Sequence, residues 1–362
     1  MSARASSARA ATPHASRSKD EAVLGAALAS PGPWRRAWED VRANRAAFVA
    51  LVFLAVVAAL SLLAPLLPLP SPIALRLADE PLAPAAPWNG FLVPGFQPEY
   101  WDLGAIDRAL VALRQWIFGD LQTGPWLGTD QKGRDLLARI VWGSRTSLAV
   151  GLLATMTSLV VGVTWGAVAG LAGGRVDQVL MRIVDALYSL PFIFVVIFLI
   201  TVLDGWREEL SGVLGLERES LFYVTIGLFY WLTMARVVRG QVLQLRNAEF
   251  LAASRLAGAR WPWLIRMHVL PNVLGIVLVY LTLSIPSILL FESFLSFLGL
   301  GIEAPKVSWG LLAVDGADAI SPLGLDWWLV VWPSAAMGSV LLALNVLGDG
   351  LRDALDPKGG RE

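Results

Sequence analysis

An acidic side chain inside an apolar run is the first candidate for chemistry in this sequence. Glu292 is the one charged residue between Val269 and Ile302. It could relay protons, because charges within membrane spans are costly and often functional. A structural or interface hydrogen bond explains a single isolated acid better. Asp185, which precedes Pro191, is interpreted as an interface residue beside a proline-weakened helix, and these three residues are the candidates for a membrane pathway or a subunit interface.

The other chemistry-bearing residues do not form a catalytic or metal site. The chain has no cysteine, and its two histidines, His14 and His268, lie in different contexts, so a thiolate site is excluded and a histidine metal centre is disfavoured. The sequence lacks the phosphate loop G-x-x-x-x-G-K-[ST], the G-x-S-x-G elbow and the H-E-x-x-H helix. We therefore predict a non-catalytic chain with no metal or cofactor of its own. Its formal net charge of zero gives no support for nucleic-acid binding.

A short polar segment between two apolar runs is the other candidate site. Residues 249–272 read EFLAASRLAGARWPWLIRMHVLPN. Asn247 is predicted to cap a helix that begins one residue later, with Glu249 in its first turn. Gly258 suits a left-handed end for that helix, and Pro262 suits the first turn of a second helix. The pattern predicts two short helices joined by a glycine turn.

One face of the first predicted helix is suited to contact with a partner. At helical spacing, Glu249, Ala252, Ala253 and Leu256 fall on the same face. The two alanines would let a backbone or groove approach closely, and the neighbouring arginines could meet carboxylates. The segment is therefore either a docking element for a partner's cleft or an ordinary basic loop on the cytoplasmic side. The residues alone favour neither of these two interpretations.

Composition indicates that these residues belong to a membrane protein. The chain is 56% hydrophobic and 16% charged, with a mean hydropathy of +0.61, whereas soluble domains carry about 25% charge. A membrane-spanning helix needs about 20 mostly apolar residues. Six spans are predicted, which makes this an all-α membrane protein: Ala46–Leu67, Thr146–Gly174, Ala186–Leu203, Ser220–Ala235, Val269–Ile302 and Trp327–Gly348.

Charge between the spans predicts their orientation. Residues 236–268 hold six arginines against one acid, whereas residues 204–219 and 303–326 are acidic. Basic loops stay in the cytoplasm, so both termini are predicted to be cytoplasmic. Residues 68–144 then form an extracytoplasmic insertion between the first two spans. Four tryptophans favour a small folded cap there: Trp88, Trp101, Trp116 and Trp126.

The remaining boundaries follow from these spans. Residues 1–45 are rich in Ser, Ala and Arg and are predicted to be a disordered cytoplasmic tail. Residues 46–67 form the first span, and residues 145–350 hold the other five together with the polar loop 247–272. Residues 351–362 form a second cytoplasmic tail.

The polar loop resembles the conserved cytoplasmic loop of binding-protein-dependent ABC importer permeases. That family pattern is E-A-A, three residues, G, and then I-x-L-P further on. Gly258 matches the glycine, and after nine more residues His268–Asn272 (HVLPN) matches the end. The triplet falls on residues 252–254 (AAS), so its acid is missing. Glu249 lies one turn earlier on the same face and becomes the acid to test.

Four further stretches are similar to the second-type permease of di- and oligopeptide importers. They are LGTDQKGRDLLARIVWGSRTSLAVGL (127–152), GGRVDQVLMRIVDALYSLP (173–191), SFLSFLGLGIEAPKVSWG (293–310) and LNVLGDGLRDALDPK (344–358). They occur in the family's order. The resemblance extends over residues 126–358.

The resemblance implies a fold, a function and partners. The chain would have the type I ABC importer permease fold and form half of a peptide pathway with a second, homologous permease in the bacterial cytoplasmic (inner) membrane. Two ATPase subunits, which bind ATP and Mg²⁺, would dock beneath it, and an extracytoplasmic binding protein would deliver the substrate. The implied ATPase contacts are Glu249, Ala252, Ala253, Ser254, Leu256, Gly258, Ala259 and Arg260, with His268, Pro271 and Asn272 at the end of the loop.

Three other functions stay open at this point, and one of them is a membrane anchor or scaffold with no transport role. A proton-coupled secondary transporter would use Glu292 as its coupling group, although such proteins often show internal repeats and none is evident here. An importer of the same family could also carry a non-peptide substrate such as a metal chelate. The lack of cysteine and the scarcity of histidine give no support for that substrate.

Overall fold

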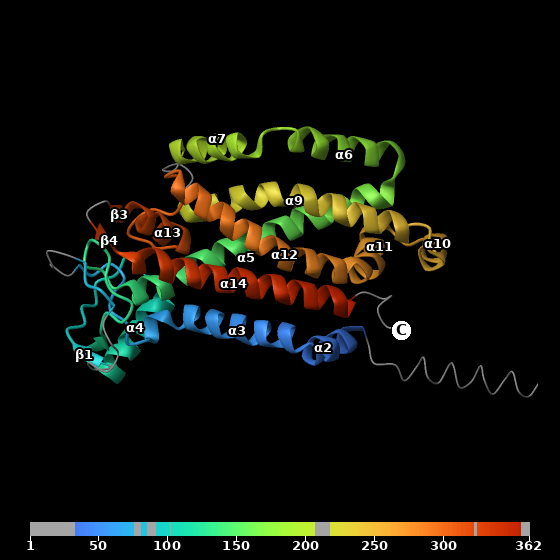
Figure 1. Ribbon diagram of the computed structural model, residues 1–362. Coiled ribbons are helices and arrows are strands. Elements are labelled where there is room, and N and C mark those ends of the chain that lie inside the picture. Colours follow the sequence, from blue (N-terminus) through green and yellow to red (C-terminus); the bar gives the residue numbers. More distant parts are fainter. Residues whose placement is uncertain are drawn as a thin grey trace, which may run out of the picture.

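Long helices run side by side through the middle of the molecule, and short elements gather at its two ends (Figure 1). The computed structural model describes residues 33–75, 81–84, 92–101, 103–206, 218–321 and 324–355. We call the end that carries α4, α13 and the strands the insertion end, and the end that carries α10 and α11 the loop end (Figure 1). The two sets of short elements are thus separated by the length of the bundle.

Helices make up most of the described chain. The long ones are α3 (Arg45–Leu62), α5 (Leu136–Ala172), α9 (Arg218–Leu245), α12 (Leu270–Phe297) and α14 (Trp327–Leu355). The shorter ones are α2 (Pro33–Ala43), α4 (Ala105–Phe118), α6 (Gly174–Tyr188), α7 (Phe192–Gly205), α10 (Glu249–Leu256), α11 (Trp261–Leu264) and α13 (Trp309–Asp318). A 3₁₀ turn covers Ala64–Leu66 and a π-helical turn covers Ile265–Val269. Two antiparallel strand pairs complete the fold: β1 (Leu92–Pro94) with β2 (Leu121–Thr123), and β3 (Ile320–Ser321) with β4 (Gly324–Leu325).

The spans differ from the predicted ones. In the described part of the chain, four helical segments are long and apolar enough to cross a membrane: Arg45–Leu62, Leu136–Ala172, Trp261–Phe297 and Trp327–Leu355. A fifth results if the bent pair α6–α7 counts as one span, with 86° between its two helices. The prediction of one unbroken span over residues 186–203 is therefore wrong, because α6 ends and α7 begins within that range. Charged residues border the apolar stretch 220–235 of α9, which is not among the five, so a sixth span stays a prediction.

One helix was not predicted, and another begins earlier than predicted. α2 occupies residues 33–43, which were included in the predicted disordered tail. It is short and carries no long apolar run, so hydropathy gives no sign of it. α5 begins at Leu136 rather than at Thr146, because Asp135 caps it by accepting a hydrogen bond from a backbone N–H in its first turn. Residues 1–32 and 356–362 of the two predicted tails lie outside the described residues.

A stripe of glycines lets α5 and α9 pack against each other closely. Gly162, Gly166 and Gly170 recur every four residues and therefore share one face of α5. A Cβ added at Gly166 would lie 2.4 Å from the carbonyl oxygen of Ala235, and one at Gly162 would lie 2.6 Å from the Cβ of Met234. Only glycine permits this approach. Small residues at helix contacts are typical of membrane bundles, where backbones must come close for van der Waals packing.

The described part of the insertion has a small core of its own. Trp142 of α5 is buried and packs against Tyr100 and Trp101, with 5.2 Å between ring centroids in each case. Burial raises the pKa of Tyr100 to about 12, so its phenol stays neutral at physiological pH. These contacts join the insertion to the first turns of α5. Trp88 lies outside the described residues.

A network of four charged side chains fixes the insertion end. Asp130 accepts hydrogen bonds from Arg134 at 2.7 Å and from Arg139 at 2.6 Å. Arg139, which is 1% exposed, also donates to Asp315 of α13 at 2.9 Å. A buried charge is tolerated when it is paired in this way. The network ties the loop before α5, α5 itself and α13 into one unit.

Candidate functional site

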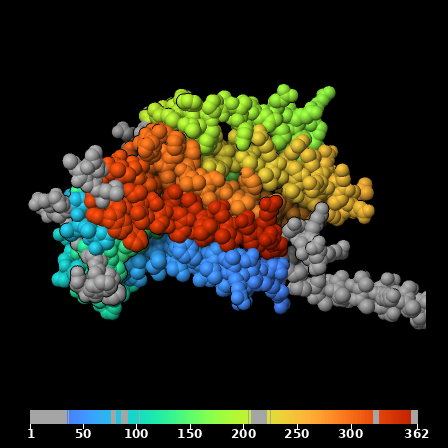
Figure 2. Space-filling view, viewed as in Figure 1, coloured from blue at the N-terminus to red at the C-terminus, as the bar shows by residue number. Residues whose placement is uncertain are grey.

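The polar loop folds into α10 and α11, which protrude at the loop end of the molecule (Figure 2). One prediction about it is wrong. Ala248, rather than Asn247, is the N-cap of α10, and it makes no side-chain hydrogen bond. Asn247 lies one residue too early, because the first helical residue is Glu249. The first turn of α10 is therefore left without a side-chain cap.

The turn after α10 depends on Gly258. Its φ is +84°, in the left-handed region that favours glycine. The N–H of Gly258 donates to the carbonyl of Arg255, and the N–H of Ala259 donates to the carbonyl of Ser254. These two bonds form a Schellman motif, which satisfies the last carbonyls of a helix and turns the chain. Gly258 thus has the predicted conformation, and Pro262 lies in the first turn of α11 as predicted.

The predicted contact face of α10 points to solvent. Glu249, Ala252 and Ala253 are exposed, and Leu256 is 90% exposed. Leu251, on the opposite side of the helix, is completely buried and anchors α10 to the bundle. Phe250, Trp261 and Trp263 of the two short helices are exposed as well, and a group of exposed apolar side chains is typical of a contact surface. Within the described part of the chain, the whole predicted face of α10 is therefore exposed.

His268 joins α10 to the start of α12. Its Nε2 lies 3.0 Å from the Oγ of Ser254, and its ring packs between Phe250 and Trp263 at centroid distances of 5.7 and 5.1 Å. The side chain of Asn272 donates to the backbone carbonyl of His268 at 2.6 Å. The end of the loop therefore holds α10 in place through side-chain contacts. We call Phe250, Ser254, Trp263, His268 and Asn272 together the His268 clasp.

The remaining predicted residues of the loop lie where α11 and α12 begin. Arg260 is exposed and has the extended backbone of an N-cap, directly before α11. Ala259 is partly buried between the two short helices. Pro271 is the second residue of α12 and follows the π-helical turn directly, and as a proline it has no N–H to donate to the preceding turn. The π-helical turn that precedes it widens the backbone where the loop meets the long helix.

Asp185 forms part of a charged groove between α6 and α9. Arg236 donates to Asp185 at 2.8 Å, and Arg239 donates to both oxygens of Asp177 at 3.0 and 2.6 Å. The groove encloses about 430 Å³ and also contains Arg182. Asp185 is thus an inter-helix ion-pair residue of this chain.

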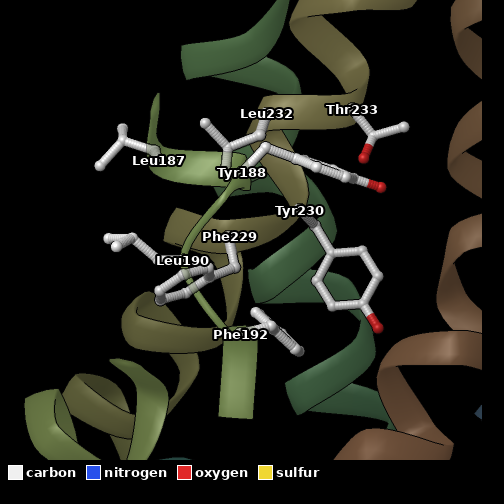
Figure 3. Close-up of a pocket in the computed structure, with 8 residues that line it drawn as sticks. All are labelled: Leu187, Tyr188, Leu190, Phe192, Phe229, Tyr230, Leu232 and Thr233. Carbon is white, nitrogen blue, oxygen red and sulfur yellow. The ribbon is translucent and has the colours of Figure 1, made fainter. Parts of the chain in front are cut away.

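The bend between α6 and α7 lies at Pro191, and a pocket of about 390 Å³ opens beside it. Figure 3 shows the hydroxyl groups of Tyr188, Tyr230 and Thr233 on one side of this pocket and Leu187 on the other. Proline cannot continue the helix of the preceding residues, because it lacks the N–H and clashes with the previous turn. The bend therefore comes from the sequence and shapes the pocket.

Glu292 is enclosed within the protein. It is 1% exposed and accepts hydrogen bonds from Ser308 at 2.7 Å and from Ser296 at 3.1 Å. Ser308 also caps α13 by accepting from the N–H of Leu311. A Cβ at Gly310 would lie 2.7 Å from the carboxylate. Glu292 thus has the contacts of a structural acid that joins α12 to α13, and Asp185, Pro191 and Glu292 do not form one site.

Sequence reasoning missed the ion pairs that join distant segments of the chain. Arg239 and Asp177 are 62 residues apart in the sequence, and Arg139 and Asp315 are 176 residues apart. An arginine just inside an apolar stretch is the signal that could have pointed to them, since such a charge needs a partner. Among the described residues, no group of three or more His, Asp or Glu side chains could hold a metal ion.

Comparison with known proteins gives two family matches. Residues 162–360 match the model of "Binding-protein-dependent transport system inner membrane component". Residues 32–84 match the "N-terminal TM domain of oligopeptide transport permease C". The first match includes α10, α11 and the His268 clasp, and the second includes α2 and α3.

Individual relatives agree with the family matches. The oligopeptide transport system permease protein OppC of Escherichia coli (strain K12) is 39% identical over 330 residues, which cover 90% of this chain and 92% of that protein. The dipeptide transport system permease protein DppC of Bacillus subtilis (strain 168) is 45% identical over 233 residues, 64% of this chain and 68% of that protein. A solved structure of the MetNI methionine ABC transporter covers 60% of this chain at 17% identity and a TM-score of 0.47, a score that defines no shared conformation.

Proposed function

Because this chain belongs to the family of binding-protein-dependent transport system inner membrane components, we propose that it forms half of the membrane pathway of an ATP-driven peptide importer. Membership confirms the resemblance seen in the sequence and the helical importer-permease fold. The family is a transport component and not a catalyst, and it works with ATPase subunits, a second permease and a binding protein. The specific partners and substrate are our proposal.

The exposed face of α10 is the observation that carries the docking proposal. An apolar leucine, two alanines and Glu249 point outward from a helix whose opposite side is buried. Such a small, convex element fits the cleft of a partner rather than a flat surface. We assign that cleft to the two ATPase subunits, with ATP and Mg²⁺ bound in them and none in this chain.

The loop is built to transmit movement as one piece. The Schellman turn at Gly258 fixes the angle between α10 and α11, and the His268 clasp joins α10 to the start of α12. ATP-driven closure of the two ATPase subunits would move this piece, and α12 would carry the movement into the bundle. Switching between inward-facing and outward-facing states needs a bistable element of this kind.

Peptide is the proposed substrate because the relatives that cover the chain are named for oligopeptide and dipeptide transport. A metal chelate is a weaker proposal, since the chain has no cysteine and two histidines. A proton-coupled mechanism through Glu292 is weaker still. Its carboxylate accepts hydrogen bonds from two serine hydroxyls and is 1% exposed, which are the contacts of a structural acid.

Charge reversal at Glu249 tests the docking proposal. The complex of this chain with the second permease, the ATPase subunits and the binding protein is reconstituted in proteoliposomes, and ATP-dependent uptake of a labelled peptide is measured. We expect Glu249→Arg to lower uptake at least tenfold and to remove the stimulation of ATP hydrolysis by the loaded binding protein. Asp353→Arg is the matched control, since Asp353 is an exposed acid in the last turns of α14.

The outcomes separate the parts of the proposal. Full stimulation of ATP hydrolysis in Glu249→Arg would show that Glu249 is not part of the contact with the ATPase subunits. Absence of ATP-dependent uptake of any peptide by the unmodified complex would contradict the peptide importer itself. Uptake driven by a proton gradient without ATP would favour the secondary transporter instead.

A further inference from the structure

A stripe of exposed apolar side chains runs along one face of α3. Val49, Val52, Phe53, Val56 and Leu60 are between 36% and 65% exposed, and at helical spacing they share one face. Of the four unbroken spans, α3 has the smallest buried share, 17% of its apolar window against 28% or more in the others. We call these five residues the α3 stripe. Within the described part of the chain, no other element covers it.

An arginine without an ion pair lies at the end of the α3 stripe. Arg45 is the first residue of α3 and precedes Val49 by four positions, so it falls on the same face as the stripe. It is exposed, and among the described residues it has no ion-pair partner. Its charge is therefore placed where a long apolar surface ends. In a membrane protein this is the level at which lipid headgroups begin.

Helix α2, at the loop end of the bundle (Figure 1), adds a tryptophan and a second arginine. Ala37 and Val41 are buried on one side of α2, whereas Trp38 and Arg42 are exposed on the other. The guanidinium carbon of Arg42 lies 5.7 Å from the centroid of the Trp38 ring, within the range of a cation–π contact. This contact orients the arginine and leaves its charge in place.

The acids nearby do not neutralise the two arginines of this region. Glu39 is paired with Arg35 at 2.9 Å. Asp40 falls on the opposite side of α2 from the exposed arginine of that helix. Asp349 and Asp353, in the last turns of α14, are exposed, and no acid in the described part of the chain forms an ion pair with either arginine. Both cations are thus available to an anion.

We propose that Trp38, Arg42 and Arg45 form a docking surface for an anionic phospholipid whose acyl chain lies along the α3 stripe. The two guanidinium groups donate charge-assisted hydrogen bonds to the lipid phosphate. The tryptophan ring lies at the boundary between headgroup and hydrocarbon, where this residue type is common. The inference needs α3 to span a membrane and does not depend on the transported substrate.

Length and charge both fit a lipid. From Val49 to Leu60 the stripe extends over about 17 Å of helix, and one leaflet contributes about 15 Å of hydrocarbon, so one acyl chain covers it. Phosphatidylcholine carries a cationic group beside its phosphate, whereas phosphatidylglycerol has a net negative charge. Each arginine near an anionic lipid strengthens binding about fivefold. Two of them predict a preference of roughly 25-fold for phosphatidylglycerol.

The test identifies the lipid that lies beside the stripe. The chain has no cysteine, so Val49→Cys gives it one attachment site for a fluorophore, at a position that is 65% exposed. The labelled chain, in complex with its partner subunits, is placed in phosphatidylcholine nanodiscs that contain a small fraction of brominated phosphatidylglycerol or brominated phosphatidylcholine. Bromine quenches the fluorophore only at close range, so the ratio of the two quenching constants measures the lipid preference at this position.

We expect Arg42→Gln and Arg45→Gln each to lower the preference for phosphatidylglycerol about fivefold, and the double variant to bring it close to one. Arg255→Gln is the matched control. Arg255 is an exposed arginine at the same end of the bundle, on α10 and outside the proposed surface, so its removal should leave the preference unchanged.

Equal quenching by the two lipids in the protein with both arginines would overturn the inference. So would an equal loss of preference in Arg255→Gln and Arg45→Gln, because the attraction would then be a diffuse property of the loop end. Absence of quenching by either lipid would also overturn it and would assign the stripe to a contact with another subunit. A complex that transports no peptide but keeps the lipid preference would contradict the proposed function and support this surface.

Discussion

At the scale of single residues, the backbone of Gly258 decides whether α10 can turn into α11. A side chain there would find open space, since nothing lies within 4 Å of an added Cβ. The restriction is therefore conformational and not steric: φ is +84°, whereas proline fixes φ near −65° and lacks the N–H that bonds to Arg255. We expect Gly258→Pro to reduce peptide uptake in proteoliposomes at least tenfold while insertion into the membrane is retained.

Gly258→Asn is the control for that variant. Asparagine enters the left-handed region at a cost of about 1 kcal/mol and keeps the N–H, so uptake should stay within about threefold of the unmodified protein. Equal loss of uptake in both variants would show that any side chain at this position interferes with the partner. Normal uptake by Gly258→Pro would show that the Schellman turn is not needed for coupling.

At the scale of elements, two ion pairs hold α6 against α9. Asp177–Arg239 is the tighter one, and its side chains are 11% and 36% exposed. Screening by solvent limits such a pair to about 1 kcal/mol. We expect Asp177→Arg and Arg239→Asp to lower the melting temperature of the solubilised protein by about 1–2 °C each. The double variant with both exchanges should recover most of the loss, because the opposite charges face each other again.

A double-mutant cycle with these variants measures the coupling between the two helices. Arg182→Glu is the matched control, since Arg182 lines the same groove and has no ion pair in the described part of the chain. Additive effects of the two reversals, without recovery in the double variant, would mean that the pair contributes nothing to the attachment of α6.

Sequence patterns predicted local features better than contacts between elements. Gly258 and Pro262 were predictable because a left-handed turn and a first helical turn each depend on one residue type. The bend at Pro191 has an equally local cause, yet hydropathy alone merged its surroundings into one span. The pair of Asp177 with Arg239 was not predictable, because their meeting depends on how α5, α6 and α9 pack.

At the scale of the whole molecule, the insertion and the polar loop lie at opposite ends of the bundle (Figure 1). The proposed mechanism needs them on opposite sides of a membrane, with peptide entering at one end and the ATPase subunits docking at the other. The basic residues between 236 and 268 predict that the loop end is cytoplasmic. The arrangement in space and the distribution of charge therefore support the same topology, from independent evidence.

The absence of cysteine from the sequence makes this topology directly measurable. Trp116→Cys places a thiol on α4 at a position that is 84% exposed, and Leu256→Cys places one on α10 at a position that is 90% exposed. A membrane-impermeant maleimide added to intact spheroplasts should label Trp116→Cys fully and Leu256→Cys only after the membrane is permeabilised. Ala47→Cys is the control for access, since Ala47 is completely buried within the bundle and should stay unlabelled in both conditions. Labelling of Leu256→Cys from outside would reverse the orientation, and the loop end would then be out of reach of any cytoplasmic ATPase.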